Sequence, residues 1–311
     1  MESNRVFAYA AVMRYMSDYS NHWRSEQSLS EFLSEQKTVA ISGVDTRFLT
    51  NHLRENGTCS ACVVAAEADI NVIEKRALAL AQSFAGLNGR DLASEVTTDQ
   101  PYQWEEGTCS LQALLPASVS PRGPHVVVLD YGVKRQMLRL LVDQGCRVSV
   151  VPATTKFEAV MGMKPDGVLL SNGPGDPAAC ASMIDVIKEL IQVKMPLFGI
   201  CLGHQLLALA LGAKTKKMDF GHHGANHPVQ DFTLGSSVIS SQNHGFVVDA
   251  ESLPKHFTLT QQSLFDGTIQ GFQHQNYPIM SVQGHPEASP GPHDWQGLFA
   301  LFVKMMEEHC A

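Results

Sequence analysis

A cysteine between two glycines is the residue in this sequence that points most directly to chemistry. Cys201 lies in Gly199-Ile200-Cys201-Leu202-Gly203, the Gly-x-nucleophile-x-Gly pattern of a sharp strand-to-helix turn. Such a turn exposes the nucleophile, and the free N–H groups of the following helix favour a thiolate and can bind an anion. A buried cysteine in a packing corner is the alternative. The paired glycines favour the nucleophile.

A histidine and a glutamate two residues apart supply the base that such a cysteine needs. His285 and Glu287 lie in Gly284-His285-Pro286-Glu287. Residues i and i+2 of an extended chain face the same way, and Pro286 disfavours helix at His285. The carboxylate can then fix the tautomer of an imidazole that meets the thiol. A histidine that merely ends a strand is the alternative, and the presence of the cysteine turn favours a Cys-His-Glu triad.

Two further segments are candidates for a binding role. The segment 171–177, Ser-Asn-Gly-Pro-Gly-Asp-Pro, is rich in glycine but lacks the Gly-Lys-Ser/Thr of a phosphate-binding loop. Its Gly173 N–H could donate to an oxyanion, although a plain turn is the alternative. The segment 220–228 holds three histidines without an interleaved carboxylate or cysteine, so we predict no metal site there.

The elements around Cys201 follow the alternation that is typical of a parallel sheet. Fully apolar runs of strand length are separated by amphipathic helical segments, which predicts a sheet covered on both faces. The predicted strands are 126–129, 148–151, 168–170 and 197–200, and the predicted helices are 133–144, 157–161 and 183–193. Later strands are predicted at 229–232, 238–240, 257–260, 268–273 and 279–283, before a closing helix at 294–308. Ligands of such sheets bind at the carboxyl ends of the strands, where Cys201 falls.

The chain upstream of this pattern has a different organisation. Residues 1–118 predict an α+β domain, 119–124 a linker rich in proline and glycine, and 125–311 the α/β domain. The upstream helices are predicted at 27–36, 46–56 and 70–84, and the strands at 38–42 and 62–65.

Composition excludes several classes of protein. The 311 residues are 44% hydrophobic, which is ordinary for a globular protein, and the formal net charge is -8 without long basic runs. This balance argues against a nucleic-acid surface. No apolar segment is explained better as a membrane span or a signal peptide than as a core element. Seven cysteines without a disulfide-like framework predict reduced thiols and a cytoplasmic location.

Taken together, these motifs resemble the class I glutamine amidotransferases and, within them, the family of small, glutamine-hydrolysing subunits of carbamoyl phosphate synthetase. The segments typical of the whole superfamily are 171–177, 199–205 and 285–287. Those that point to the small subunits are 45–47, 86–89, 220–224, 242–246, 264–268 and 284–292. The resemblance covers nearly the whole chain from about Val39. Family members begin with a further β-rich segment ahead of Met1, so we expect the first, smaller domain to be incomplete.

The resemblance implies a role for individual residues. Cys201 would attack the glutamine carboxamide, His285 would act as base and then acid, and Glu287 would orient His285. The N–H groups of Gly173 and Leu202 would form the oxyanion hole. The residues expected to contact glutamine are Gly173, Gly175, Leu202, Gln205, Asn243, Gly245 and Phe246.

The resemblance also implies a partner. Ammonia would pass to a large subunit, in a heterodimer or higher assembly, where ATP, Mg²⁺ and bicarbonate serve carbamoyl phosphate synthesis for arginine and pyrimidines. No cofactor is expected in this chain. An amidotransferase of a chorismate-using or nucleotide-making synthase is the alternative enzyme, against which the upstream domain and the 220–228 motif argue. An inactive interaction module is the alternative outside the enzymes.

Overall fold

The computed structural model describes residues 2–3, 5–22, 25–109 and 123–310, and the chain divides into two compact units. One unit spans Ser3–Leu87, and the other comprises Met1–Glu2 and Asn88–Ala311. Most of the predicted linker at 119–124 lies outside the described residues. Residues 88–109 cluster with the second unit, because β3 (Tyr102–Trp104) pairs with a strand of its sheet.

A ten-stranded sheet among the described residues forms the centre of the larger unit. Five parallel strands occupy its middle in the order β5-β4-β6-β7-β12. Their bounds are β4 (His125–Asp130), β5 (Arg147–Pro152), β6 (Gly167–Leu170), β7 (Leu197–Ile200) and β12 (Ile279–Val282). β3 adds an antiparallel edge to β5. The predicted parallel sheet of the α/β fold is therefore confirmed.

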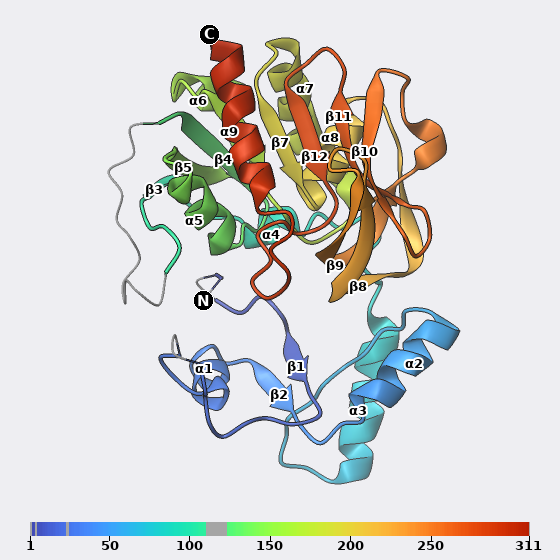
Figure 1. Cartoon of the computed structure of the whole chain (residues 1–311). Helices are drawn as coiled ribbons and strands as arrows, with labels where there is room; N and C mark the ends of the chain where they lie inside the picture. Colours follow the sequence, from blue (N-terminus) through green and yellow to red (C-terminus); the bar gives the residue numbers. More distant parts are fainter. Residues whose placement is uncertain (1, 4, 23–24, 110–122, 311) are drawn as a thin grey trace. The chain divides into compact units, whose positions relative to one another are not determined.

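Helices cover both faces of this sheet (Figure 1). Val126 and Val128 face one cluster of buried apolar residues, while Val127 and Leu129 face another, as the strand period of two requires. α5 (Arg135–Asp143) and α9 (Gly297–Cys310) pack in the first cluster. α6 (Phe157–Gly162), α7 (Ala181–Gln192) and α8 (Leu202–Ala210) pack in the second.

The other side of the sheet is antiparallel and longer than predicted. After β12 the order is β11 (Ile269–His274), β10 (Phe257–Ser263), β8 (Thr215–Asp231) and β9 (Ser236–Val248). The sequence predicted strands over only the ends of β8 and β9 that are nearest their turn. Both strands extend through segments rich in glycine and histidine, with register shifts between Lys217 and His222 and between Gly224 and His227. Short helical turns at α4 (Ala93–Val96), η1 (Pro177–Ala179) and η2 (Ala250–Ser252) complete the unit.

The smaller unit has two parallel strands and three helices among its described residues. They are β1 (Ala10–Val12), α1 (Leu29–Glu35), β2 (Val39–Ile41), α2 (Thr46–Asn56) and α3 (Ile70–Ser83). Side chains of Ser28, Asp45 and Asp69 cap the three helices. The predicted strand at 62–65 is wrong: no regular element forms there, because no neighbouring strand takes up its backbone hydrogen bonds.

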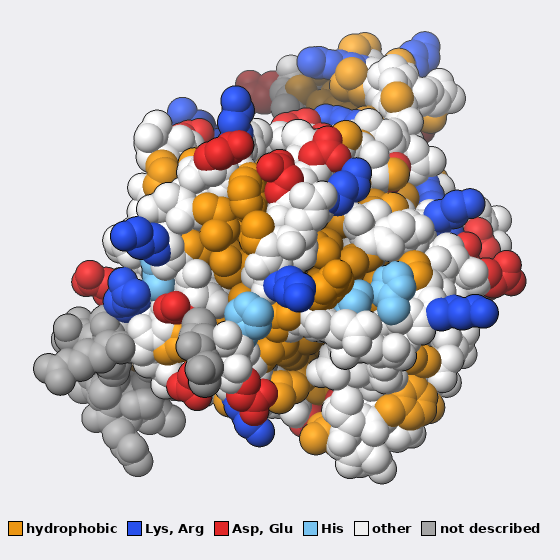
Figure 2. Space-filling model, turned by 90° about the horizontal axis from the view of Figure 1, so that it is seen from above, with side chains coloured by type: hydrophobic (Ala, Val, Ile, Leu, Met, Phe, Trp, Pro, Cys, Tyr) orange, Lys and Arg blue, Asp and Glu red, His pale blue; other side chains and the backbone are white. Residues whose placement is uncertain are grey.

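The surface carries charges of both signs. On the face in Figure 2, Lys and Arg side chains are interspersed with Asp and Glu rather than gathered into one basic area. Among the described residues, no helix is both long and apolar enough to cross a membrane.

Candidate active site

The turn at Cys201 has the strained geometry that the sequence predicts. Cys201 joins β7 to α8 with φ +54° and ψ −102°, in the left-handed range that residues other than glycine rarely adopt. A Cβ at Gly203 would lie far inside van der Waals contact with the Leu170 carbonyl oxygen. A Cβ at Gly199 would lie 2.7 Å from the Gly203 carbonyl oxygen. Both glycines are therefore required by the close approach of backbone around the cysteine.

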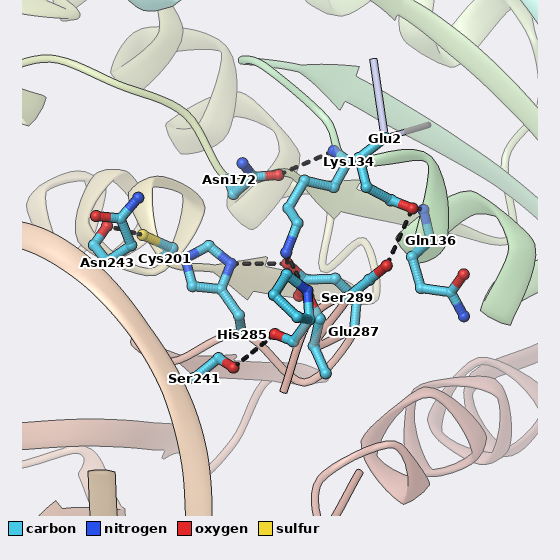
Figure 3. A network of polar contacts seen from close by, with 12 residues as sticks. Glu2, Lys134, Gln136, Asn172, Cys201, Ser241, Asn243, His285, Glu287 and Ser289 are labelled. Carbon is cyan, nitrogen blue, oxygen red and sulfur yellow. Dashed lines mark hydrogen bonds and ion pairs between the residues drawn. The ribbon is translucent and has the colours of Figure 1, made fainter. Parts of the chain in front are cut away.

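His285 and Glu287 meet as a buried pair beside this turn. The Nδ1 atom of His285 lies 2.7 Å from Glu287 Oε1, and the two residues are 7% and 0% exposed. Figure 3 shows the imidazole between the Cys201 sulfur and the Glu287 carboxylate. Among the described residues, His285 Nε2 is buried without a hydrogen-bond partner. The structure thus brings the three predicted catalytic residues into one line, with the second ring nitrogen left to serve the thiol.

Electrostatics favour the charged forms of this pair. Burial alone would lower the pKa of His285, but the Glu287 carboxylate and the Cys201 sulfur together raise it to about 10. Burial likewise works to raise the pKa of Glu287, and the stronger influence of His285 and Lys134 holds it below its usual value. An imidazolium next to the sulfur stabilises a thiolate, which is the nucleophilic form of cysteine.

Lys134 completes the line and is absent from the sequence prediction. Its Nζ lies 3.0 Å from Glu287 Oε1 and donates a hydrogen bond to the Ala288 carbonyl oxygen. Its backbone N–H donates to Asn172 Oδ1 at 3.2 Å (Figure 3). Lys134 follows the carboxyl end of β4, the edge of a parallel sheet where ligands gather. That position was the one signal that could have identified it.

A second set of contacts ties the segment after Glu287 to the start of α5. Glu2 Oε2 accepts from the Gln136 N–H at 2.8 Å, and Glu2 Oε1 accepts from Ser289 Oγ at 3.0 Å (Figure 3). A carboxylate at this position is favoured by the free N–H groups of the helix start. Ser289 has φ +54°, so the segment is held in a strained conformation by its neighbours.

Two backbone N–H groups beside the cysteine turn are those predicted to form an oxyanion hole. Among the described residues, no hydrogen bond engages the N–H of Gly173 or of Leu202, while the neighbouring Gly203 N–H donates to Ser171 O at 3.1 Å. A Cβ at Gly173 would lie 2.7 Å from Leu202 Cδ2, so the two residues are adjacent. The segment 171–177 therefore lies against the cysteine turn.

The remaining predicted glutamine contacts divide into two groups. Asn243 O lies 4.0 Å from Cys201 Sγ. The Gln205 N–H donates to Cys201 O at 3.2 Å, and its side-chain Nε2 donates to Phe246 O at 2.7 Å, which links Phe246 to the cysteine turn. Gly245 lies in β9 next to them, with open space where a Cβ would be. Gly175 instead packs against the backbone of Arg90 and Leu92, and its contact with glutamine stays a prediction.

Two histidines of β8 contact polar side chains of the segment 263–266. His222 Nε2 lies 2.9 Å from Asp266 Oδ2, and His227 Nε2 lies 3.0 Å from Ser263 Oγ. Burial is the largest cause that lowers the pKa of His227, to about 4. Within the described part of the chain, no group of three or more His, Cys, Asp or Glu side chains could hold a metal ion.

Comparisons with known proteins agree with this geometry. Residues 127–305 match the family model of class-I glutamine amidotransferases, and residues 1–63 match that of the carbamoyl-phosphate synthase small chain, CPSase domain. The carbamoyl phosphate synthase small chain of Vibrio vulnificus is 51% identical over 312 residues, covering 100% of this chain and 82% of the relative. That of Pseudomonas aeruginosa is 51% identical over 311 residues, covering 99% and 81%.

A solved structure supports the fold of the larger unit. A protein from Thermoplasma acidophilum, described as one of the subunits of a GMP synthase, superimposes with a TM-score of 0.54 at 25% identity, covering 61% of this chain and 96% of that one. Residues 1–63, which match the small-chain family, lie upstream of the amidotransferase fold. This match distinguishes the chain from amidotransferases such as the Thermoplasma protein. The chain belongs to the family of carbamoyl phosphate synthase small chains, with a class I glutamine amidotransferase fold in its C-terminal region.

Proposed function

We propose that this chain hydrolyses L-glutamine to glutamate and ammonia through Cys201, His285 and Glu287, as the small chain of a carbamoyl phosphate synthase. The observation that carries the proposal is the buried line of Glu287, His285 and the sulfur at the strained turn. The family membership supplies the substrate and the overall reaction.

The first half of the reaction forms a thioester. The Cys201 thiolate attacks the carboxamide carbon of glutamine, and the N–H groups of Gly173 and Leu202 donate to the oxyanion that forms. The protonated His285 gives its proton to the departing nitrogen, the C–N bond breaks, and ammonia leaves. Glu287 keeps the imidazole in the tautomer and orientation that this transfer needs.

The second half releases glutamate. The now neutral His285 takes a proton from water, and the resulting hydroxide attacks the thioester carbon. The C–S bond breaks, the thiolate of Cys201 is restored beside the protonated His285, and the new carboxylic acid gives its proton to water as glutamate leaves. Lys134 acts as a positioning residue in both halves, because its ammonium faces the same Glu287 oxygen that holds His285.

Binding of glutamine involves the residues that surround the sulfur. In this proposal Gln205, Asn243, Gly245 and Phe246 contact the substrate, which the contacts of Asn243 and Gln205 near the cysteine support, and the N–H groups of Gly173 and Leu202 bind the oxyanion. In the described residues, Gln205 Oε1 takes part in no hydrogen bond, which leaves it free to accept one from a substrate ammonium.

Ammonia is the product that the partner uses. As a small chain, this protein associates with a large chain, and we propose a heterodimer or higher assembly in which ammonia passes to that chain. ATP, Mg²⁺ and bicarbonate would bind there, and no cofactor would be needed in this chain. A cytoplasmic location stays a prediction.

The test measures glutamate and ammonia from L-glutamine, with and without a large chain of a close relative. Cys201→Ser should reduce turnover by about 10⁴-fold or more while folding is kept, because the hydroxyl is a poorer nucleophile at this site. Cys146→Ser is the matched control, since Cys146 is a buried cysteine of the same unit that precedes the amino end of β5, at the opposite edge of the parallel strands from Cys201. Turnover by Cys201→Ser equal to that of the wild type would contradict the proposal.

A second outcome distinguishes the remaining alternative. If no hydrolysis occurs under either condition and the large chain still binds, the chain is an interaction module rather than a glutaminase.

A further inference from the structure

A buried glutamine beside the nucleophile has no part in the reaction described so far. Gln283 follows β12, is 0% exposed, and its Nε2 lies 3.8 Å from Cys201 Sγ. The parallel register pairs Ile200 with Val282, so the next residues of each strand, Cys201 and Gln283, lie side by side. The Cys201 N–H also donates to Val282 O at 2.9 Å, which fixes this register at the turn.

We propose that Gln283 is a further catalytic residue, whose amide donates a hydrogen bond to the Cys201 sulfur, stabilises its thiolate, and couples that sulfur to the glutamine site through Gln205. The proposal deepens the proposed function and rests on it for the contact between Gln205 and glutamine.

Neighbouring groups fix which way the Gln283 amide is turned. Phe246 O is a backbone carbonyl and can only accept, so the Gln205 group 2.7 Å from it is the NH₂. The same Nε2 of Gln205 lies 3.0 Å from the Gln283 side chain, whose facing atom must then be the oxygen. The NH₂ of Gln283 is left to face the sulfur. Turning the Gln283 amide over would place two NH₂ groups against each other.

Among the described residues, the sulfur therefore has a backbone carbonyl acceptor and an amide donor beside it. Asn243 O, 4.0 Å from Sγ, can only accept and favours the protonated thiol. The Gln283 amide donates and favours the thiolate, because a hydrogen bond to a charged acceptor is stronger than one to a neutral acceptor. The Gln283 contact is buried and the Asn243 contact is partly buried, and burial makes such preferences count for more than in water. Gln283 thus adds to the effect of the imidazolium of His285.

The series of hydrogen bonds from Phe246 through Gln205 and Gln283 to the Cys201 sulfur also links glutamine binding to the reactivity of the thiolate. Gln205 holds Gln283 through its single NH₂ group. A substrate that orders Gln205 also orders the donor at the sulfur. We therefore expect loss of Gln283 to lower kcat more than it raises KM.

The test measures how fast iodoacetamide alkylates Cys201 as a function of pH. The chain has seven cysteines, so the Cys201 peptide is followed by mass spectrometry. In Gln283→Leu, the pH at which alkylation reaches half its maximal rate should rise by about one unit, since a donor to the thiolate is lost. The kcat/KM for glutamine should fall by about tenfold to a hundredfold.

Gln283→Glu sharpens the test because it keeps the shape of the side chain and the oxygen that accepts the hydrogen bond from Gln205. Its second oxygen would face the sulfur in place of the donor, so both the alkylation shift and the loss of turnover should exceed those of Gln283→Leu. Should Gln283→Leu not fold, this near-isosteric variant decides the question alone.

Gln261→Leu is the matched control. Gln261 is 2% exposed in the same sheet and bonds to Asp231 rather than to the sulfur. Its loss should lower stability and leave the alkylation profile at its wild-type position. A folded Gln283 variant with a wild-type alkylation profile would overturn the proposal. Alkylation needs no glutamine, so the alkylation result does not depend on whether the wild type hydrolyses glutamine. Glutamine hydrolysis by the wild type tests the proposed function separately.

Discussion

The two compact units of this chain differ most in how much apolar surface they bury. In the larger unit, apolar side chains fill both faces of a ten-stranded sheet. Among the described residues of Ser3–Leu87, Leu33 is the one buried apolar side chain, while Phe48 and Ile70 are 69% and 70% exposed. Two paired strands and three short helices bury too little to be rigid on their own.

Because of this difference, we expect catalysis to depend on the packing of the larger unit and not on that of the smaller one. Every residue of the proposed site lies in the larger unit, where close packing can hold side chains in one geometry. Substitutions at tightly packed positions of the larger unit should therefore lower the unfolding free energy or the glutamine turnover strongly. Matched substitutions in Ser3–Leu87 should lower them only slightly.

Gly203→Ala should have the largest effect. The added Cβ would collide with the Leu170 carbonyl oxygen, so α8 or β6 must move, and we expect a loss of more than about 3 kcal/mol in unfolding free energy. Gly43→Ala is the matched change, since Gly43 has φ +83° but nothing within 4 Å of a Cβ. It should cost about 1–2 kcal/mol from backbone strain alone. Denaturant unfolding measures both, and equal costs would contradict the comparison.

Lys134→Met should have the next largest effect. The substitution leaves the fully buried Glu287 with His285 as its remaining charged partner, which should cost about 2 kcal/mol and lower glutamine turnover by about tenfold or more. Lys188→Met removes a surface pair with Asp185 and should change stability by less than about 0.5 kcal/mol. If turnover of Lys134→Met matched that of the wild type, Lys134 would not position the triad.

The parallel half of the sheet could be predicted because its signals are local. Three of the four predicted parallel strands are continuous apolar runs and the fourth, 148–151, is interrupted only by Ser149; each lies where it was expected. The turn at Cys201 could be predicted for the same reason, since two glycines around a nucleophile define its geometry. The contact between His285 and Glu287 follows from their spacing of two residues.

The long hairpin and the partners of the triad could not be predicted in this way. The parts of β8 and β9 that the sequence did not predict include glycine, histidine and asparagine, whose strand preference is weak, so pairing with a distant segment decides their structure. Lys134 and Gln283 reach the site through strand order and register, which a single sequence does not show.

A change of pH should separate the two units at the alkaline end of the scale. The raised pKa of His285, about 10 against an ordinary value of about 6.5, gives stability that is fully present below about pH 6.5 and is lost as pH rises to about 10. The lowered pKa of Glu287 gives stability that is present above about pH 4.3 and is lost on acidification. The larger unit should therefore weaken between pH 7 and 10.

In the smaller unit, the backbone N–H and hydroxyl of Ser28 lower the pKa of Glu31, so this contribution is lost only in acid. Hydrogen exchange at several pH values, corrected for intrinsic rates, can follow both units. His285→Gln should remove the alkaline loss in the larger unit, and persistence of that loss in the variant would mean that another group titrates.

Apart from the control variants, Ser28→Ala should have the smallest effect. Ser28 Oγ accepts from the Glu31 N–H at 3.2 Å, and Glu31 Oε2 accepts from the Ser28 N–H at 2.9 Å, which together form a capping box. Losing the cap should cost about 1 kcal/mol and lower hydrogen-exchange protection in α1 about fivefold. Glutamine turnover should not change, because α1 lies outside the unit that holds the site. A fall in turnover larger than the fall in protection would show that catalysis depends on the smaller unit, contrary to what the comparison predicts.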